Sequence, residues 1–319
     1  MANEKTTLTE VKIASLGGNG VLAKCEYENP SGSHKYRVYH HIIRRLEEEG
    51  KITPGMTLID ASSLNGGAAL AYIGRERGYK IKIVTLDSMS REKIAKVQSY
   101  GGEVIFLHST APKGYYNSPE EIGDIRTAAE AIAKKEGFYY LNQGSSDLNV
   151  HACRTMGQEI IEQLAEKKKN PDYFICGAGT GGTIMGVGSV LKENYPSIKV
   201  ICVEPDNANA LEAKLKKREA RNGAHALTGI GAGDASEGLV DISLLEDVVL
   251  VSEEEWKSTL CELVEKDYRV GKSSAGEIAA IKKLGQQGHK GVFLTIFFDR
   301  LENYLSEFSE YGGSHERKT

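Results

Sequence analysis

The chain has 319 residues, of which 40% are hydrophobic and 26% are charged, as in a soluble globular protein with one or two domains. A net charge of −4 and a pI near 6.1 leave no basic footprint for nucleic acid or an anionic membrane. The five cysteines are far apart without CxxC spacing, which argues against a zinc site or a disulfide framework. No apolar signal segment or membrane-span length is found, so we expect a cytoplasmic protein.

The first informative element is a turn-rich segment, Asn29–Arg37, that leads directly into a predicted helix ended by Gly50. The apolar face of this helix consists of Val38, Ile42, Ile43 and Leu46. Lys35 stands at the start of the helix, where the dipole disfavours a positive charge. That position lowers the pKa of an amine and favours the neutral nucleophile that a Schiff base requires.

Strand-like and helix-like segments alternate after this helix. The first block is Thr57–Ala61, Ala68–Arg77, Ile81–Leu86, Arg91–Tyr100 and Glu103–Leu107. The second block is Tyr173–Cys176, Ile184–Asn194 and Lys199–Val203. Strands joined by single helices form right-handed crossovers, so we expect an α/β protein with parallel sheets covered on both faces. A less regular stretch around residues 108–150 separates the blocks, which predicts two lobes.

Two loops leave a predicted strand and enter a helix, namely Ser62–Gly67 and Gly177–Thr183. In open α/β sheets, ligands bind outside the carboxyl ends of the strands. The backbone N–H groups and the helix dipole at such a loop favour an anion. We therefore expect the functional site at these two loops.

The second loop contains G-x-G-x-x-G, and Glu204 ends the next strand about 20 residues later. This spacing is also found in dinucleotide sites, so an NAD(P) oxidoreductase is an alternative, as are tight turns without a ligand. Thr180 and Thr183 flank the glycines and can each donate a hydrogen bond to a terminal phosphate. These hydroxyls favour a phosphomonoester cofactor.

Four ordered segments resemble motifs of the cysteine synthase / cystathionine β-synthase family of fold-type II pyridoxal-phosphate enzymes. The similarity extends from about Val11 to Leu305. The segments resemble the N-P-[ST]-x-S-x-K stretch, the T-S-G-N-T-G loop, the phosphate cup and the G-x-S-S run, and they are Asn29–Lys35, Ser62–Gly67, Gly179–Thr183 and Gly271–Ser274.

The resemblance implies pyridoxal 5'-phosphate as the cofactor, with Lys35 as the Schiff-base lysine and general base. Asn65 would bind the 3-oxygen of the cofactor, and Ser273 would face its pyridine nitrogen. For Ser273 the alternative is a helix N-cap, and for the serines of the first loop it is simple turn chemistry. The phosphate would be held by Gly179, Thr180, Gly181, Gly182 and Thr183. The substrate would be held by Ser62, Ser63, Leu64, Gly66 and Gln143.

The substrate side departs from the family pattern. Leu64 replaces a glycine and adds bulk, while Gly66 replaces a threonine and removes a hydroxyl donor. The segment Gly144–Val150 is also unlike the family. We therefore expect β-replacement on a small β-substituted amino acid through an aminoacrylate, cysteine-synthase-like with altered specificity. Alternatives are a β-elimination lyase that releases ammonia and a keto acid, and a non-catalytic protein that binds the cofactor.

The resemblance also implies a two-domain architecture similar to the tryptophan synthase β-subunit, each domain being a mostly parallel sheet flanked by helices. The smaller domain would be 36–143 and would carry the substrate-carboxylate loop. The larger domain would be 1–35 plus 144–319 and would carry the phosphate-binding loop. The implied partners are a small amino acid and a small nucleophile, in a homodimer with no metal, nucleic acid or membrane.

Overall fold

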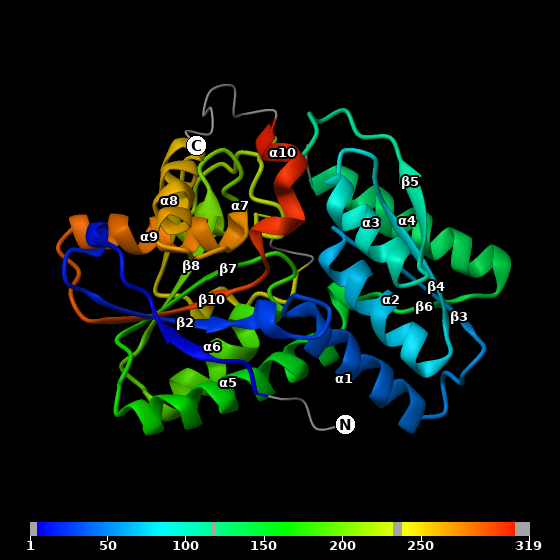
Figure 1. Cartoon of the computed structure of the whole chain (residues 1–319), viewed down its shortest axis with the longest axis horizontal. Helices are drawn as coiled ribbons and strands as arrows, with labels where there is room; N and C mark the ends of the chain where they lie inside the picture. The colour runs from blue at the N-terminus through cyan, green and yellow to red at the C-terminus, as the bar shows by residue number, and fades with distance from the viewer. Residues whose placement is uncertain (1–4, 116–118, 232–237, 310–319) are drawn as a thin grey trace, which may run out of the picture.

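The computed structural model describes residues 5–115, 119–231 and 238–309 (Figure 1). In this part of the chain the strands form a six-stranded sheet and a four-stranded sheet. The larger sheet has the order β1 (Leu8–Glu10), β2 (Gly20–Cys25), β10 (Val292–Phe297), β7 (Tyr173–Gly177), β8 (Lys199–Pro205) and β9 (Asp247–Val251). The smaller sheet has the order β5 (Glu103–Leu107), β4 (Lys80–Leu86), β3 (Thr57–Ala61) and β6 (Tyr139–Tyr140).

The α-helices of the described residues alternate with these strands and cover both sheets (Figure 1). They are α1 (Lys35–Glu48), α2 (Asn65–Arg77), α3 (Arg91–Ser99), α4 (Pro119–Glu136), α5 (Asp147–Lys167), α6 (Gly182–Asn194), α7 (Ala210–Lys216), α8 (Glu253–Glu265), α9 (Lys272–Gln286) and α10 (Leu305–Ser309). The α/β fold with parallel sheets flanked by helices is confirmed. The predicted strands and helices recur with ends shifted by a few residues.

The larger sheet is parallel except at its edge, where β1 runs antiparallel to β2. Its central strand β7 is buried along its whole length, because its apolar sequence YFICG is covered on both faces. Helices α5 and α6 lie on one side of this sheet, while α8 and α9 lie on the other (Figure 1). The chain leaves the carboxyl end of β7 in a loop that leads to α6.

The smaller sheet is parallel throughout. The connections β3–α2–β4 and β4–α3–β5 step in one direction, whereas β5–α4–β6 steps back past them. Because such crossovers are right-handed, α4 covers the face opposite to α2 and α3. The stretch 108–150 is therefore more regular than its sequence suggested, since it contains the 18-residue helix α4 and the strand β6.

The smaller sheet takes its strands from residues 57–140, and the larger sheet takes its strands from residues before and after that range. The domain boundaries at Tyr36 and Gln143 stay a prediction. Of functional importance is that the loops after β3 and β7 open toward one another. Helices α1 and α9 also begin at this place, and the four chain segments line one pocket.

Candidate active site

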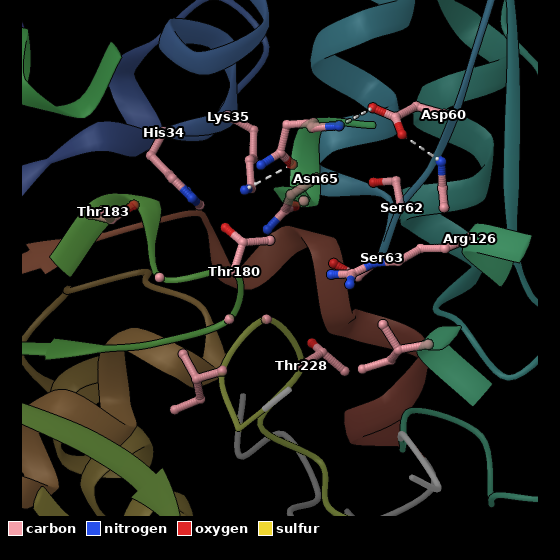
Figure 2. A pocket seen from close by; sticks show the side chains of 18 of the residues that line it. His34, Lys35, Asp60, Ser62, Ser63, Asn65, Arg126, Thr180, Thr183 and Thr228 are labelled. Carbon is pink, nitrogen blue, oxygen red and sulfur yellow. Dashed lines mark hydrogen bonds between the residues drawn. The ribbon is translucent and has the colours of Figure 1, made fainter. Parts of the chain in front are cut away.

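The pocket between the two sheets brings together most of the residues that the sequence marked (Figure 2). The predicted residues that line it are Lys35, Ser62, Ser63, Asn65, Gln143, Gly179, Thr180, Gly181, Thr183 and Ser273. Leu64, Gly66 and Gly182 are not among the lining residues. The outer members of this set are 238 positions apart in the chain, from Lys35 to Ser273, so the fold and not local sequence assembles the pocket.

Lys35 is the first residue of α1, and its amine lies deep in the pocket. The Nζ atom donates a hydrogen bond to Oε1 of Gln143 at 3.1 Å. The pKa of Lys35 is lowered to about 8, mainly by burial and to a smaller extent by the charge of Arg126. A substantial fraction of this amine is therefore neutral near physiological pH.

His34 precedes this lysine, and its ring packs edge-on against Phe298 with 4.8 Å between the ring centroids. Burial holds the pKa of His34 well below its ordinary value of 6.5. The imidazole is consequently neutral at physiological pH and adds no second positive charge beside the Lys35 amine. His34 and Phe298 thus form an uncharged part of the pocket lining.

The glycine loop after β7 is closely packed by its neighbours. A Cβ atom on Gly179 would lie 2.4 Å from the carbonyl oxygen of Gly229, and one on Gly182 would lie 2.2 Å from Oδ1 of Asn149. Asn149 also donates from Nδ2 to Oγ1 of Thr180 at 2.9 Å. The loop accepts only glycine at these positions and keeps its backbone open toward the pocket.

The loop also provides free donors at the start of α6. Within the described residues, the N–H groups of Gly181, Gly182 and Thr183 make no hydrogen bond. The hydroxyl groups of Thr180 and Thr183 stand beside them in the pocket (Figure 2). Amides at a helix N-terminus with two adjacent hydroxyls make a suitable set of donors for a phosphate. These residues fit the phosphate group of the implied cofactor.

The loop after β3 is held by Ser62, whose Oγ accepts hydrogen bonds from the N–H groups of Leu64 at 3.0 Å and Gly67 at 2.9 Å. Leu64 takes a left-handed conformation with φ of 79°, and its side chain is fully buried in the core. The bulk that Leu64 was expected to add to the substrate site therefore points away from it. That Leu64 and Gly66 bind the substrate stays a prediction. It now concerns only their backbone groups, because the Leu64 side chain is buried in the core.

Gly66 leaves no room for the threonine of the family pattern. A Cβ atom at this position would lie 2.8 Å from Oγ of Ser62 and 3.0 Å from the ring of Tyr39. The Tyr39 hydroxyl donates to Oδ2 of Asp60 at 2.9 Å, and both side chains are buried. The tyrosine thus fills the space in which a larger residue 66 would lie.

Asn65 and Ser273 both line the pocket. The Nδ2 atom of Asn65 donates to Oδ2 of the buried Asp299 at 2.8 Å, which fixes the orientation of the amide. Ser273 is the second residue of α9, and the N-cap of that helix is Gly271. The alternative that Ser273 caps the helix is therefore wrong, and its buried hydroxyl is left for another role.

Sequence reasoning missed two charged residues of the pocket, Asp60 and Arg126. Asp60 is the last residue but one of β3 and accepts hydrogen bonds from the N–H groups of Ala61 and Gln143 as well as from the Tyr39 hydroxyl. Burial raises the pKa of Asp60 to about 6. Position at the carboxyl end of a predicted strand was the available signal for Asp60.

No cluster of three potential metal ligands occurs within the residues that the structure describes. In the same residues, no helix is long and apolar enough to cross a membrane.

Known proteins resemble this chain in sequence and in fold. A family model described as "Pyridoxal-phosphate dependent enzyme" matches residues 1–299. The cysteine synthase of Staphylococcus aureus (strain N315) is 32% identical over 291 residues, which are 90% of this chain and 87% of that protein. Cysteine synthase A of Escherichia coli (strain K12) is 33% identical over 280 residues, which are 86% of this chain and 83% of that protein. The crystal structure of an O-ureido-L-serine synthase superposes with a TM-score of 0.84 at 26% identity, covering 98% of this chain and 95% of that one.

Proposed function

The chain belongs to the pyridoxal-phosphate-dependent enzyme family, and we propose that it replaces the β-substituent of a small amino acid with a nucleophile, using Lys35 as its Schiff-base lysine. The observation that carries this proposal is the meeting, in one pocket, of the Lys35 amine with the loops after β3 and β7, each of which leads into a helix N-terminus. The relatives named cysteine synthase and O-ureido-L-serine synthase support a reaction of this type.

Lys35 is suited to its role by its environment. A lysine must lose its proton before it can attack an aldehyde, and the lowered pKa of about 8 makes this step accessible near neutral pH. Lys272 has a pKa lowered to a similar value, but its amine donates to Glu307 and to the carbonyl of Gly114 and does not line the pocket. Of these two lysines, Lys35 alone can meet the cofactor.

We propose that the two loops bind the anionic groups of the cofactor and the substrate. The cofactor phosphate would be held by Thr180, Thr183 and the free amides at the start of α6. The substrate carboxylate would be held at the start of α2, where the N–H groups of Asn65 and Gly66 make no hydrogen bond within the described residues. Nε2 of Gln143 is buried in the same pocket without a partner, and it can donate to the same carboxylate.

When bound, pyridoxal phosphate withdraws electrons from the α-carbon of an amino acid. The neutral amine of Lys35 would take the α-proton as general base. Ser273 would be the partner of the pyridine nitrogen, and its neutral hydroxyl stabilises a protonated ring less than a carboxylate would. This favours loss of a β-substituent over transamination.

The test is reduction of the purified enzyme with borohydride, followed by peptide mapping. The expected result is one cofactor mass on the peptide that contains Lys35 and none on the peptide that contains Lys272. Lys35→Ala should still bind the cofactor through its phosphate but should lack the absorption band of the covalent form. Cofactor mass on another lysine, or on none, would contradict the proposal.

A second measurement separates replacement from elimination. Keto acid and ammonia are measured with a panel of serine derivatives, with and without an added thiol. Replacement predicts little keto acid and a new β-substituted product when the thiol is present. Equal keto acid formation in both conditions would show a β-elimination lyase instead. Failure of every derivative to change the absorption spectrum would indicate a cofactor-binding protein without this activity.

The family resemblance also supports a homodimer that works in the cytoplasm. Sedimentation equilibrium should then give about twice the chain mass of 34.8 kDa. A mass equal to that of one chain would refute the dimer. Cell fractionation that finds the protein outside the cytosol would refute the location.

A further inference from the structure

Arg126 is a charged residue of the pocket to which the reaction as proposed assigns no task. It lies on α4, the helix that covers the smaller sheet. Ile122, Ile125 and Arg126 line the pocket together, at positions i, i+3 and i+4 of one helix face. Ile125 is buried in the core beneath this face, and the arginine extends into the pocket from the side opposite Thr183 (Figure 2).

Gly144 has no side chain and therefore leaves space for the Arg126 guanidinium. A Cβ atom on Gly144 would lie 2.7 Å from Nη2 of Arg126 and 3.1 Å from its Cζ. Any larger residue at 144 would push the arginine out of its place. Gly144 directly follows Gln143, so the guanidinium lies next to the proposed carboxylate-binding side of the pocket.

Within the described residues, Arg126 makes no hydrogen bond or ion pair. The buried Arg37 shows the usual arrangement, since it pairs with Glu26 and Glu159. Asp60 is the acidic residue that shares the pocket with Arg126, and its oxygens already accept from Tyr39 and two backbone amides. Arg126 therefore presents a fork of unused donors to whatever enters the pocket.

The anions of the proposed reaction already have their own partners. The cofactor phosphate has the glycine loop on the opposite side, and the substrate α-carboxylate has the start of α2 with Gln143. We infer that Arg126 binds a second carboxylate or phosphate, carried either on the β-substituent of the amino acid or on the nucleophile. This inference rests on the proposed function, and it names the substrate class as one with an extra anionic group.

The experiment compares substrates that differ in the presence of an extra anionic group. For the donor, these are O-succinyl-L-serine against O-butanoyl-L-serine and O-phospho-L-serine against O-acetyl-L-serine, each with sulfide. For the nucleophile, they are mercaptoacetate against 2-mercaptoethanol with a fixed donor. The readout is the ratio of kcat/KM for the anionic member to kcat/KM for the neutral member.

The wild-type enzyme should prefer the anionic member in one arm, and that arm identifies which substrate carries the charge. Arg126→Gln should lower this ratio by roughly 10- to 100-fold, because a hydrogen bond between charged groups contributes about 1.5–3 kcal/mol. Arg126→Lys should keep part of the preference, since it retains charge but not the bidentate geometry. Arg91→Gln, at an exposed position on α3, is the matched control and should keep the wild-type ratio.

Ratios near one in both arms for the wild type, or a ratio that Arg126→Gln leaves unchanged, would overturn the inference. The proposed function would survive that result if borohydride still placed the cofactor on Lys35 and neutral donors still reacted. Absence of cofactor from Lys35 would instead overturn the proposed function itself. Thermal unfolding and cofactor absorbance of each variant verify that the ratios come from folded enzyme with bound cofactor.

Discussion

Glu277 connects the buried interior of the protein to the glycine loop of the pocket, and substitutions at this residue test that connection. The residue lies on α9 and is fully buried. Its Oε1 accepts the N–H of Gly177, the residue that starts the glycine loop, at 2.8 Å. Its Oε2 accepts from the hydroxyl of Thr295. Burial raises the pKa of Glu277 from its ordinary 4.5 to about 8, so the folded protein holds this carboxyl protonated at neutral pH.

The pH dependence follows from this difference in pKa. Between about pH 4.5 and pH 8 the folded state binds a proton at Glu277 that the unfolded chain has lost. Unfolding then releases a proton, so this residue makes the free energy of unfolding fall by about 1.4 kcal/mol per pH unit as the pH rises. Over the whole window the effect reaches about 5 kcal/mol, which is an upper estimate.

Glu277→Gln removes the titration but keeps the shape and the oxygen that accepts from Gly177. The assay is urea unfolding at a series of pH values with pyridoxal phosphate in excess. The variant should gain stability relative to the wild type, and the difference should grow by about 1.4 kcal/mol per pH unit between pH 5.5 and pH 8. Glu254→Gln, at an exposed site, should show a difference within about 0.5 kcal/mol at every pH.

A difference that stays flat from pH 5.5 to pH 8 would refute the reasoning, because it would mean that the carboxyl is ionised throughout. Glu277→Ala separates charge from support of the loop. It leaves the N–H of Gly177 without its acceptor, which costs about 1–3 kcal/mol. It should therefore retain less cofactor after dialysis than Glu277→Gln, as measured by the absorbance of the bound cofactor.

Three further outcomes are expected from single substitutions. Tyr39→Phe removes the hydroxyl donor of the buried Asp60, so it should raise the pKa of Asp60 above about 6 and cost about 1–3 kcal/mol in urea unfolding at pH 8. Gly66→Thr should cost about 1–3 kcal/mol in thermal unfolding, because its Cβ would meet Ser62 at 2.8 Å; unchanged stability would contradict this contact. Ser252→Ala should lower the stability by about 1 kcal/mol, because it removes the capping box of α8; an unchanged urea midpoint would show that the cap contributes nothing.

The sequence predicted the βαβ blocks well because their strands are continuous apolar runs. The helix α4 was missed, although Ile122, Ile125, Ala129 and Ala133 repeat at helical spacing and α4 buries three of them. Recognition of that pattern would have placed Arg126 on the same face as Ile122. Its position inside the pocket still depends on a right-handed crossover that carries α4 across the sheet, which is a property of the fold and not of local sequence.

Leu64 shows a second limit of sequence reasoning. A leucine in place of glycine suggested bulk in the substrate site, since side chains of a loop usually point toward solvent or ligand. The left-handed backbone of Leu64, which is rare for such a residue, turns the side chain into the core instead. The buried side chain of Leu64 therefore cannot carry the change of specificity that we inferred from the sequence.

The two lysines with lowered pKa show why pKa alone does not identify a reactive residue. From the sequence we attributed a lowered pKa of Lys35 to its position at a helix N-terminus. Lys272 also begins a helix. In both cases burial is the largest cause that lowers the pKa to about 8. The difference lies in what surrounds each amine. Lys272 is held in an ion pair with Glu307, whereas Lys35 makes one bond to the amide of Gln143 and faces the pocket. The reactivity that we propose for Lys35 thus requires a desolvated amine and free access together, and only tertiary structure provides that combination.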